Sequence, residues 1–361
     1  MIGFGEKPGL CFLLAFLWWH AALAAFGQES GEAADGNDEQ VLIPLAFYTP
    51  ETGVAGGVTL LQFFGSDREN PSSLQPLLIY TQKQQTLGIL TGRYYAMDAR
   101  LLNRFTLGYR RFPAVFYGIG SAAGDRDQEG YTPQEVSGRA SLQIRLGRSR
   151  IFAGPAVDRS AHKVVRTESG GVLQQGVLPG TEPVQVSGYG LLIDTDTRDN
   201  PFSTEFGYFS RLLYMTREGD LEWSELRFDM RRFYTLDPEH VLAYRLVWAR
   251  VWGEAPFFRL PTPGGQNLLR GLPVGRFNDR FLGSGQLELR RPLRDEFTLA
   301  VFAGLAGVAP EPATWPGEKI LTSGGVGLRY LLAKKRRIRV RFDIGVGEGY
   351  RGFYVNIMEA F

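Results

Sequence analysis

The stretch Gly264–Leu293, GGQNLLRGLPVGRFNDRFLGSGQLELRRPL, places a single conspicuous arginine in a glycine-rich loop ahead of an alternating strand. Arg270 stands directly before Gly271, between two leucine-containing pieces of the loop. Polar and apolar residues then alternate along Gln286–Arg290, which is the period of a β-strand with two unlike faces. Glu288 falls on the polar face. The pattern predicts a loop that folds into an enclosed polar space, beside a strand wall carrying one carboxylate.

The same alternation recurs from Val41 to the end of the sequence, in short runs separated by Gly, Pro, Asn and Asp. It is clearest in residues 337–346, where isoleucine, valine and phenylalanine alternate with arginine, aspartate and glycine. A soluble sandwich turns its apolar faces toward a shared core, whereas a transmembrane barrel turns them toward lipid. Polar faces rich in arginine and glycine favour the barrel, and so do aromatic residues near strand ends. The expected aromatic girdle comprises Tyr94, Tyr95, Phe112, Phe116, Tyr117, Trp248 and Trp252.

Length sets the number of strands. Residues 41–361 leave room for about sixteen membrane strands, at ~20 residues for each strand with its connection. The sequence therefore predicts an all-β protein, a single antiparallel transmembrane barrel. Long extracellular loops are expected at 121–137, 166–183 and 309–319, and short periplasmic turns at 199–201 and 237–239.

The first part of the sequence is predicted to be a processing segment. Residues 1–24 combine a weakly basic start, an apolar core and small residues before a cleavage point after Ala24, as in a signal peptide. A membrane anchor fits less well because the apolar core is short. Residues 25–40 are acidic and without periodicity, so we expect a flexible lead-in. The only cysteine, Cys11, lies in the predicted signal peptide, which excludes disulfides and thiolate chemistry from the mature chain.

The end of the sequence predicts a final strand. Phe353, Val355, Ile357 and Phe361 would share one face of this strand, ending in an aromatic residue. That arrangement resembles the membrane-assembly signal of outer-membrane barrels. The alternative is an ordinary last strand of a soluble protein, which the predicted export disfavours.

Four segments resemble the bacterial surface antigen family of outer-membrane barrels, the superfamily of the barrel-assembly insertase and the two-partner-secretion translocases. They appear in the family's order along the chain. They are Pro44–Val58 (first strand), Asp194–Tyr208 (the DTRDNP hairpin), Gly264–Leu293 (the sixth loop and the strand after it) and Gly324–Phe361 (the closing strands).

The resemblance implies that the sixth loop enters the barrel lumen and that its arginine pairs with an acidic group on the inner wall. Here these residues are Arg270, followed by Gly271, and Glu288. Breaking such a confined pair would cost about 3–5 kcal/mol. A solvated loop arginine, which is the simpler interpretation, contributes ~0–1 kcal/mol.

The sequence departs from the family pattern at two places. Relatives often carry a second acid on the next strand, where this chain has Gly304, so the resemblance implies one lumenal carboxylate for Arg270 instead of two. Family translocases also carry polypeptide-transport-associated domains ahead of the barrel. The stretch 25–40 is too short to hold one.

Other chemistry is weakly indicated. Asp194, Asp196 and Asp199 have spaced carboxylates, but Asp and Asn before Pro are ordinary turn residues, and we expect no metal and no cofactor. His162 and His240 are the only histidines after the signal peptide, and no catalytic motif accompanies them. We therefore predict no enzyme. The net charge of +2 and scattered arginines give no nucleic-acid patch.

Three functions remain open from the sequence. The first is polypeptide translocation or outer-membrane protein insertion through a lumen gated by the 264–293 loop. The second is a passive or gated pore for small solutes, with that loop as its constriction, and the third is a structural surface barrel. The expected surroundings are outer-membrane lipid, with an unfolded polypeptide client or a periplasmic partner protein.

Overall fold

The computed structural model describes residues 39–49, 53–65, 71–124, 128–237, 240–334, 336–357 and 359–361. The predicted signal peptide at 1–24 lies outside the described residues, as does the predicted lead-in up to residue 38. The first strand begins at Glu39, slightly before the expected start at Val41. Within the described ranges, no helix is both long and apolar enough to cross a membrane.

The described residues form seventeen β-strands in one sheet, which confirms the predicted all-β class. Sixteen of them are long, as predicted, and β6 is a three-residue addition. The strands are β1 (Glu39–Thr49), β2 (Gly53–Phe64), β3 (Ser72–Thr81), β4 (Thr86–Ala96), β5 (Leu101–Arg111), β6 (Ala114–Phe116), β7 (Glu129–Arg145), β8 (Ile151–Thr167), β9 (Val184–Asp196), β10 (Gly207–Gly219), β11 (Trp223–Asp237), β12 (His240–Gly253), β13 (Phe281–Pro292), β14 (Phe297–Ala309), β15 (Leu321–Ala333), β16 (Ile338–Gly347) and β17 (Tyr350–Ile357). Two short 3-10 turns, η2 (Phe257–Arg259) and η3 (Trp315–Gly317), lie in connections.

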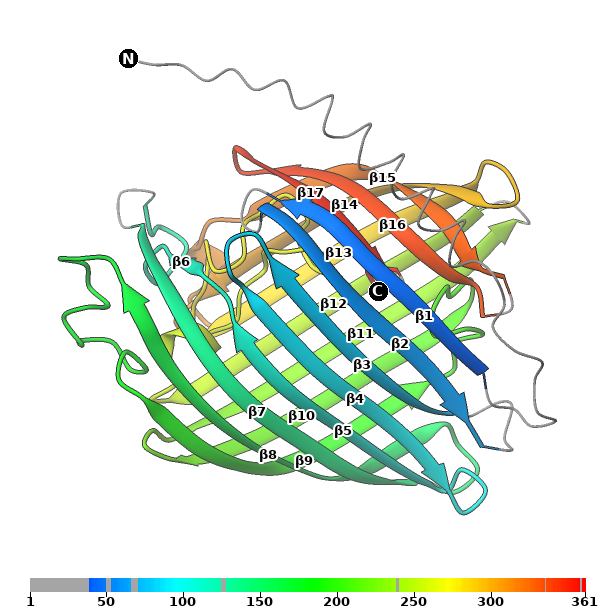
Figure 1. Cartoon of the computed structure of the whole chain (residues 1–361), viewed down its shortest axis with the longest axis horizontal. Helices are drawn as coiled ribbons and strands as arrows, with labels where there is room; N and C mark the ends of the chain where they lie inside the picture. The colour runs from blue at the N-terminus through cyan, green and yellow to red at the C-terminus, as the bar shows by residue number, and fades with distance from the viewer. Residues whose placement is uncertain are drawn as a thin grey trace.

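The long strands form an antiparallel meander that curls into a barrel (Figure 1). Each pairs with its neighbours in sequence, and β5 pairs directly with β7. The first and last strands of the meander differ from the strands between them. Among the described residues, β1 forms a hydrogen-bonded ladder with β2 alone, and β17 forms one with β16 alone. We call this junction between β1 and β17 the seam.

Side chains pack across the seam. Ile43 on β1 belongs to one buried apolar cluster with Ile338 on β16, and Ile357 on β17 packs against the same cluster. Phe63 on β2 joins it and contacts Phe202 edge-on, with ring centroids 5.6 Å apart. Among the described residues, the seam is therefore held by apolar contact, whereas each of the other junctions between neighbouring long strands has a hydrogen-bonded ladder.

The connections divide the barrel into two unlike ends. One end carries the long connections 112–128, 168–183, 254–280 and 310–320, close to the predicted long loops. The expected loop 121–137 was too long, because β7 already begins at Glu129. The opposite end has short turns, except for the connection 197–206 between β9 and β10.

The faces of the strands are inverted relative to a soluble sandwich. On β13 the side chain of Leu287 is 53% exposed, while its neighbours Gln286 and Glu288 are buried. Apolar side chains thus face outward and polar ones inward, as a lipid-facing barrel requires. The predicted girdle was wrong for Phe116 and Tyr117, which are buried.

We predict that Leu287→Arg lowers the free energy of unfolding in lipid vesicles by about 2–4 kcal/mol, because it places a charge near mid-membrane depth. Leu236→Arg is the control. Leu236 is also an exposed apolar residue, but it lies at the end of β11, where the cost is ~0–1 kcal/mol. Denaturant titration followed by tryptophan fluorescence measures both. Equal costs would contradict a membrane-embedded outer face.

Candidate functional site

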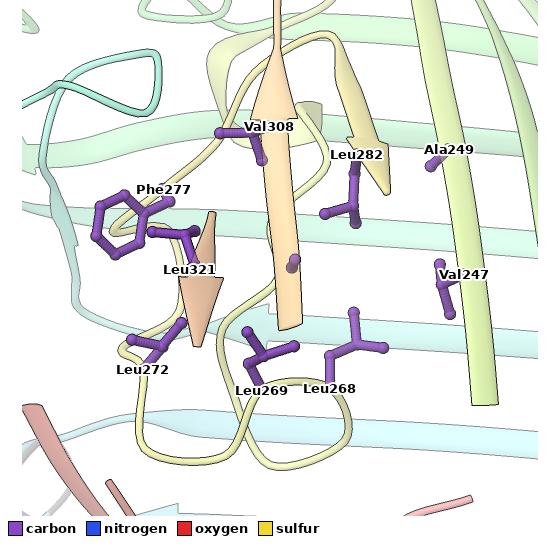
Figure 2. Close-up of a cluster of buried hydrophobic side chains, with 10 residues drawn as sticks. Val247, Ala249, Leu268, Leu269, Leu272, Phe277, Leu282, Val308 and Leu321 are labelled. Atoms are coloured by element: carbon purple, nitrogen blue, oxygen red, sulfur yellow. The ribbon is translucent and has the colours of Figure 1, made fainter. Parts of the chain in front are cut away.

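The connection 254–280, between β12 and β13, is the sixth at its end of the barrel, and it packs against the inner wall. Its leucines contact side chains from four wall strands, β12 to β15 (Figure 2). From the loop come Leu268, Leu269, Leu272 and Phe277; from the wall come Val247, Ala249, Leu282, Ala306, Val308 and Leu321. Each large apolar side chain buried this way contributes about 1.5–3 kcal/mol.

Arg270 lies at the tip of this loop and is completely buried. Its Nη2 is 2.7 Å from Glu288 Oε2, and its Nη1 donates a hydrogen bond of 2.8 Å to Asp343 Oδ2. The guanidinium carbon also lies 3.4 Å from the centre of the Phe302 ring. The structure thus brings together the predicted arginine and carboxylate, with two further contacts that were not predicted.

The implied single carboxylate partner was wrong. Gly304 does lack an acid, but β16 supplies Asp343 as the second partner of Arg270. The alternation in residues 337–346 had placed Asp343 on a polar face. What the sequence did not reveal is that β16 and β13 present their acids to the same point.

Two glycines let the loop backbone touch the wall. Gly271 has φ +110°, and a Cβ there would lie 2.7 Å from the backbone of Val346. A Cβ on Gly345 would lie 2.5 Å from the carbonyl oxygen of Arg270. Gly271 N also donates a 2.9 Å hydrogen bond to Tyr354 Oη on β17. The Arg-Gly pair therefore works as one unit, since Gly271 permits the approach that buries Arg270.

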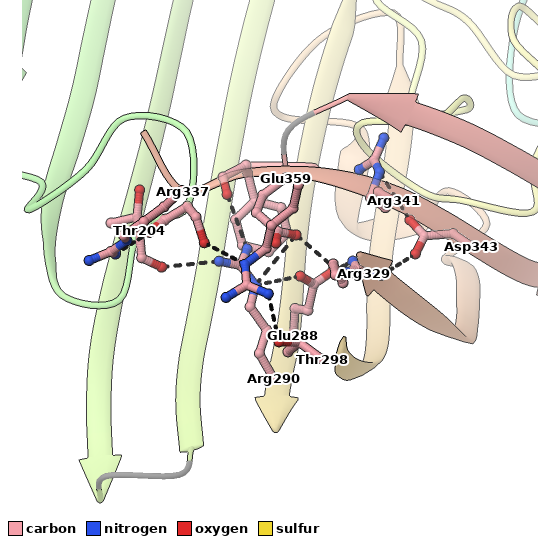
Figure 3. A network of polar contacts seen from close by, with 12 residues as sticks. Thr204, Glu288, Arg290, Thr298, Arg329, Arg337, Arg341, Asp343 and Glu359 are labelled. Carbon is pink, nitrogen blue, oxygen red and sulfur yellow. Dashed lines mark hydrogen bonds and ion pairs between the residues drawn. The ribbon is translucent and has the colours of Figure 1, made fainter. Parts of the chain in front are cut away.

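Arg270 belongs to a larger buried network of charges, and Figure 3 shows the wall residues of this network. Arg329 on β15 bridges the two acids, with Nη1 2.6 Å from Asp343 Oδ1 and Nη2 3.2 Å from Glu288 Oε2. Arg290 on β13 pairs with the other oxygen of Glu288 at 2.8 Å. Arg341 on β16 lies 3.4 Å from Asp343. We call these residues, together with Glu359, the latch network.

Residues 359–361 turn into the barrel, so the predicted position of Phe361 on the last strand was wrong. β17 ends at Ile357, and the buried Phe361 packs against Phe233 with ring centroids 6.4 Å apart. Arg290 Nη2 donates to the Phe361 carbonyl oxygen at 3.2 Å. Phe353 and Val355 alternate with Tyr354, whose hydroxyl reaches the loop. Only these two and Ile357 remain on the predicted strand face, with Ile357 in the seam cluster.

Glu359 connects this last segment to the latch network. Arg329 Nε donates to its Oε2 at 3.0 Å, and Arg290 Nε lies 3.8 Å away. Burial acts to raise the pKa of the Glu359 carboxyl, but Arg290 and Arg329 hold it below the usual value. The contribution to stability is therefore present above the ordinary glutamate pKa and is lost as pH falls through the lowered one.

The connection 197–206, between β9 and β10, lies at the end of the barrel that otherwise has short turns, which is also where β17 ends. Thr204 accepts a 3.1 Å hydrogen bond from Arg290 through its carbonyl oxygen, and Asp199 pairs with Arg337 at 2.7 Å. Asn200 Nδ2 donates to the carbonyl oxygen of Arg336. This connection and residues 359–361 both contact Arg290 of β13.

A second set of contacts holds the loop against the wall through the residues of η2, near the beginning of the loop. Phe258 of η2 stacks on His162 of β8, with ring centroids 3.5 Å apart. Arg259 forms an ion pair with Glu135 on β7. Phe257 packs edge-on against Phe116, at 5.3 Å between centroids. His162, predicted without a role, is thus a wall residue that contacts the loop.

The aspartates considered for metal binding are engaged elsewhere. Asp194 pairs with Arg104 and Arg211, and Asp196 pairs with Arg198. Asp199 accepts two backbone hydrogen bonds in its turn. Across the described residues no group of three or more His, Cys, Asp or Glu is placed to hold a metal ion. His240 lies 2.9 Å from Asp237 at the β11–β12 turn.

Comparison with solved structures identifies the architecture. BamA from Haemophilus ducreyi, solved without POTRA domains 1–3, is 12% identical with a TM-score of 0.58, over 89% of this chain and 69% of that one. The chain has the barrel fold of BamA. CdiB from Escherichia coli is 10% identical with a TM-score of 0.57, over 91% of this chain and 62% of that one. CdiB from Acinetobacter baumannii gives 11%, 0.53, 91% and 60%.

The BamA-like and CdiB-like fold is the fold that the resemblance of the four sequence segments implied. The chain spans only 60% and 62% of the two CdiB chains that it matches. No protein-family model and no curated protein matches the sequence. The fold is thus shared, while the sequence is highly divergent.

We predict that Asp343→Asn destabilises the barrel more than Arg270→Gln does. Asp343 pairs with Arg270, Arg329 and Arg341, so losing this acid removes a partner from three buried arginines, whereas without Arg270 both Glu288 and Asp343 still have arginine partners. The expected cost of Asp343→Asn is about 3–5 kcal/mol. Denaturant unfolding in detergent measures both variants. A larger loss for Arg270→Gln would contradict this assignment of partners.

Proposed function

We propose that the protein is an outer-membrane barrel that acts on polypeptides, by translocating them or by inserting other proteins into the membrane. The signal peptide predicted at 1–24 and the lipid-facing apolar surface support this location. The observation that carries the proposal is the seam. The lumenal loop is the second element, and we assign it the role of a gate.

The seam offers two strand edges. The outer edges of β1 and β17 have no ladder to one another among the described residues, and an unpaired edge is a template for an added strand. Strand addition supplies main-chain hydrogen bonds to an incoming peptide whatever its sequence. Separating the edges breaks mainly the apolar contacts around Ile43 and Ile338. Such a junction suits a protein that must admit a client strand.

The contacts of the 254–280 loop with the inner wall argue against a permanently open pore for small solutes. The loop is fastened at both Arg270 and Arg259, and residues 359–361 pack against the wall nearby through Glu359 and Phe361. A conducting state requires these contacts to break. We infer that the loop moves when a polypeptide engages, and that a separate periplasmic partner delivers this client. A solute pore remains the second candidate, and the arginine-lined lumen favours it. A structural barrel without transport is the third.

We expect that cross-linking the seam abolishes client insertion. In a Cys11→Ser background, the pair Val41→Cys and Ile357→Cys places thiols on both sides of the seam cluster. A short, cleavable thiol cross-linker should stop the purified barrel from accelerating the folding of a model outer-membrane barrel into liposomes, and cleavage should restore it. The control, Val41→Cys with Leu61→Cys, locks the paired β1–β2 hairpin and should remain active. Unchanged insertion after seam cross-linking would refute the proposal.

Conductance in planar bilayers tests the gate. Wild-type protein should be mostly closed, whereas Arg270→Ala and Glu288→Ala should increase the open time or the conductance, because each loosens the loop. Equal traces for all three proteins would exclude the gate. Steady wild-type conductance without any insertion activity would instead establish the solute pore.

A further inference from the structure

Arg341 is a fully buried arginine whose hydrogen-bonding capacity is not used. Its Nε, Nη1 and Nη2 find no hydrogen-bond acceptor among the described residues. Its ion pair is with Asp343, where Oδ2 lies 3.4 Å from Nε, so Nη1 and Nη2 are left without an acidic partner in the described part of the chain. Figure 3 shows Arg341 at the edge of the latch network, next to Asp343. A buried charged donor without an acceptor is costly, by more than the ~1–3 kcal/mol of a neutral one.

Asp343 cannot serve Arg341 fully, because both of its oxygens have closer partners. Oδ1 is 2.6 Å from Arg329, and Oδ2 is 2.8 Å from Arg270. Among the described residues, the ion pairs of the latch network join four arginine side chains to three acidic side chains. The arginines are Arg270, Arg290, Arg329 and Arg341, and the acids are Glu288, Asp343 and Glu359.

The neighbouring arginine on the same strand face shows that this is specific to Arg341. Arg339 Nε donates to Ser203 Oγ at 3.1 Å, and its Nη1 donates to Thr298 Oγ1 at 3.0 Å. Both contacts are with neutral hydroxyls, so Arg339 is satisfied without an anion. Arg341 has neither hydroxyl nor carbonyl acceptors among the described residues.

We propose that Arg341 is the binding site for a small oxyanion, a carboxylate or a phosphate, inside the barrel. The terminal nitrogens of a guanidinium form a planar fork that accepts two oxygens at once. The anion would supply the acceptors that the Arg341 guanidinium lacks among the described residues. The same chemistry is offered by a free ion and by an acidic side chain of a polypeptide in the lumen.

Anion binding should also strengthen the contact between Arg270 and Asp343. Arg270 and Arg341 share Asp343 Oδ2, so an anion on Arg341 reduces its competition for that oxygen. The Arg270 contact then strengthens, and the loop is held more firmly. By linkage, opening the loop weakens anion binding by the same factor.

The test is the unfolding temperature of the detergent-solubilised full chain, read from heat-modifiable gel migration at constant pH and ionic strength. The reference buffer contains a bulky sulfonate, which is too large to reach a buried arginine. Acetate or inorganic phosphate is then substituted for it in increasing amounts. We expect the unfolding temperature to rise saturably with acetate or phosphate concentration in wild type. The same rise is expected in the control Arg339→Gln, which removes one lumenal charge, as Arg341→Gln does. Arg341→Gln should show no rise. A short glutamate-containing peptide, compared with its glutamine version, distinguishes a polypeptide source from a free ion.

No rise in wild type, or the same rise in Arg341→Gln, would overturn the site, since the latter is a general salt effect. If Arg341→Gln does not fold, wild-type crystals soaked in selenate decide. An anomalous peak within hydrogen-bond distance of the Arg341 guanidinium supports the proposal, and its absence there rejects it. These outcomes do not depend on whether the barrel acts on polypeptides.

Discussion

The interior of this barrel depends on the pairing of Arg270 with two acids, one at each terminal nitrogen of its guanidinium. Glu288 comes from β13 and Asp343 from β16, so one loop side chain ties together strands that are not neighbours in the sheet. Inside a low-dielectric enclosure such contacts are stronger than in water, and a lost partner is correspondingly expensive. The loop position, the burial of Arg329 and the placement of residues 359–361 all follow from keeping these charges compensated.

Apolar packing and charge pairing make different contributions to docking of the loop. Leu269 and Leu272 contribute buried apolar area, which does not depend strongly on orientation. Arg270 fixes the orientation of the loop, because its planar guanidinium must meet both acids at once. Phe258 and Arg259 repeat this combination at the far end, against His162 and Glu135. A loop fastened at two separated points can release one end while the other still guides its return. The proposed gate would use this property, because one set of contacts could break while the other keeps the loop near its docked position.

Local pattern predicted the class of fold, the approximate strand number, and the inward position of Glu288, because period-two alternation is a property of each strand alone. It also put Asp343 on a polar face, but which strands face each other across a lumen depends on closure, which no local pattern encodes. Phe361 was misplaced for a related reason: the residues that follow a strand can continue it or leave it, and the partners that draw Phe361 inward, Phe233 and Arg290, are distant in sequence. Phe116 and Tyr117 were misassigned because a buried loop contact and a girdle demand the same residue type.

The glycine contact between loop and wall makes full docking of the loop depend on a later strand. Gly271 rests on the backbone of β16, and Arg270 finds its second acid there, although β16 lies more than sixty residues further along the chain. Contacts of such high sequence separation are slow to form. We therefore expect the contacts of Arg270 and Gly271 with β16 to form late in folding, after β16 has joined the wall.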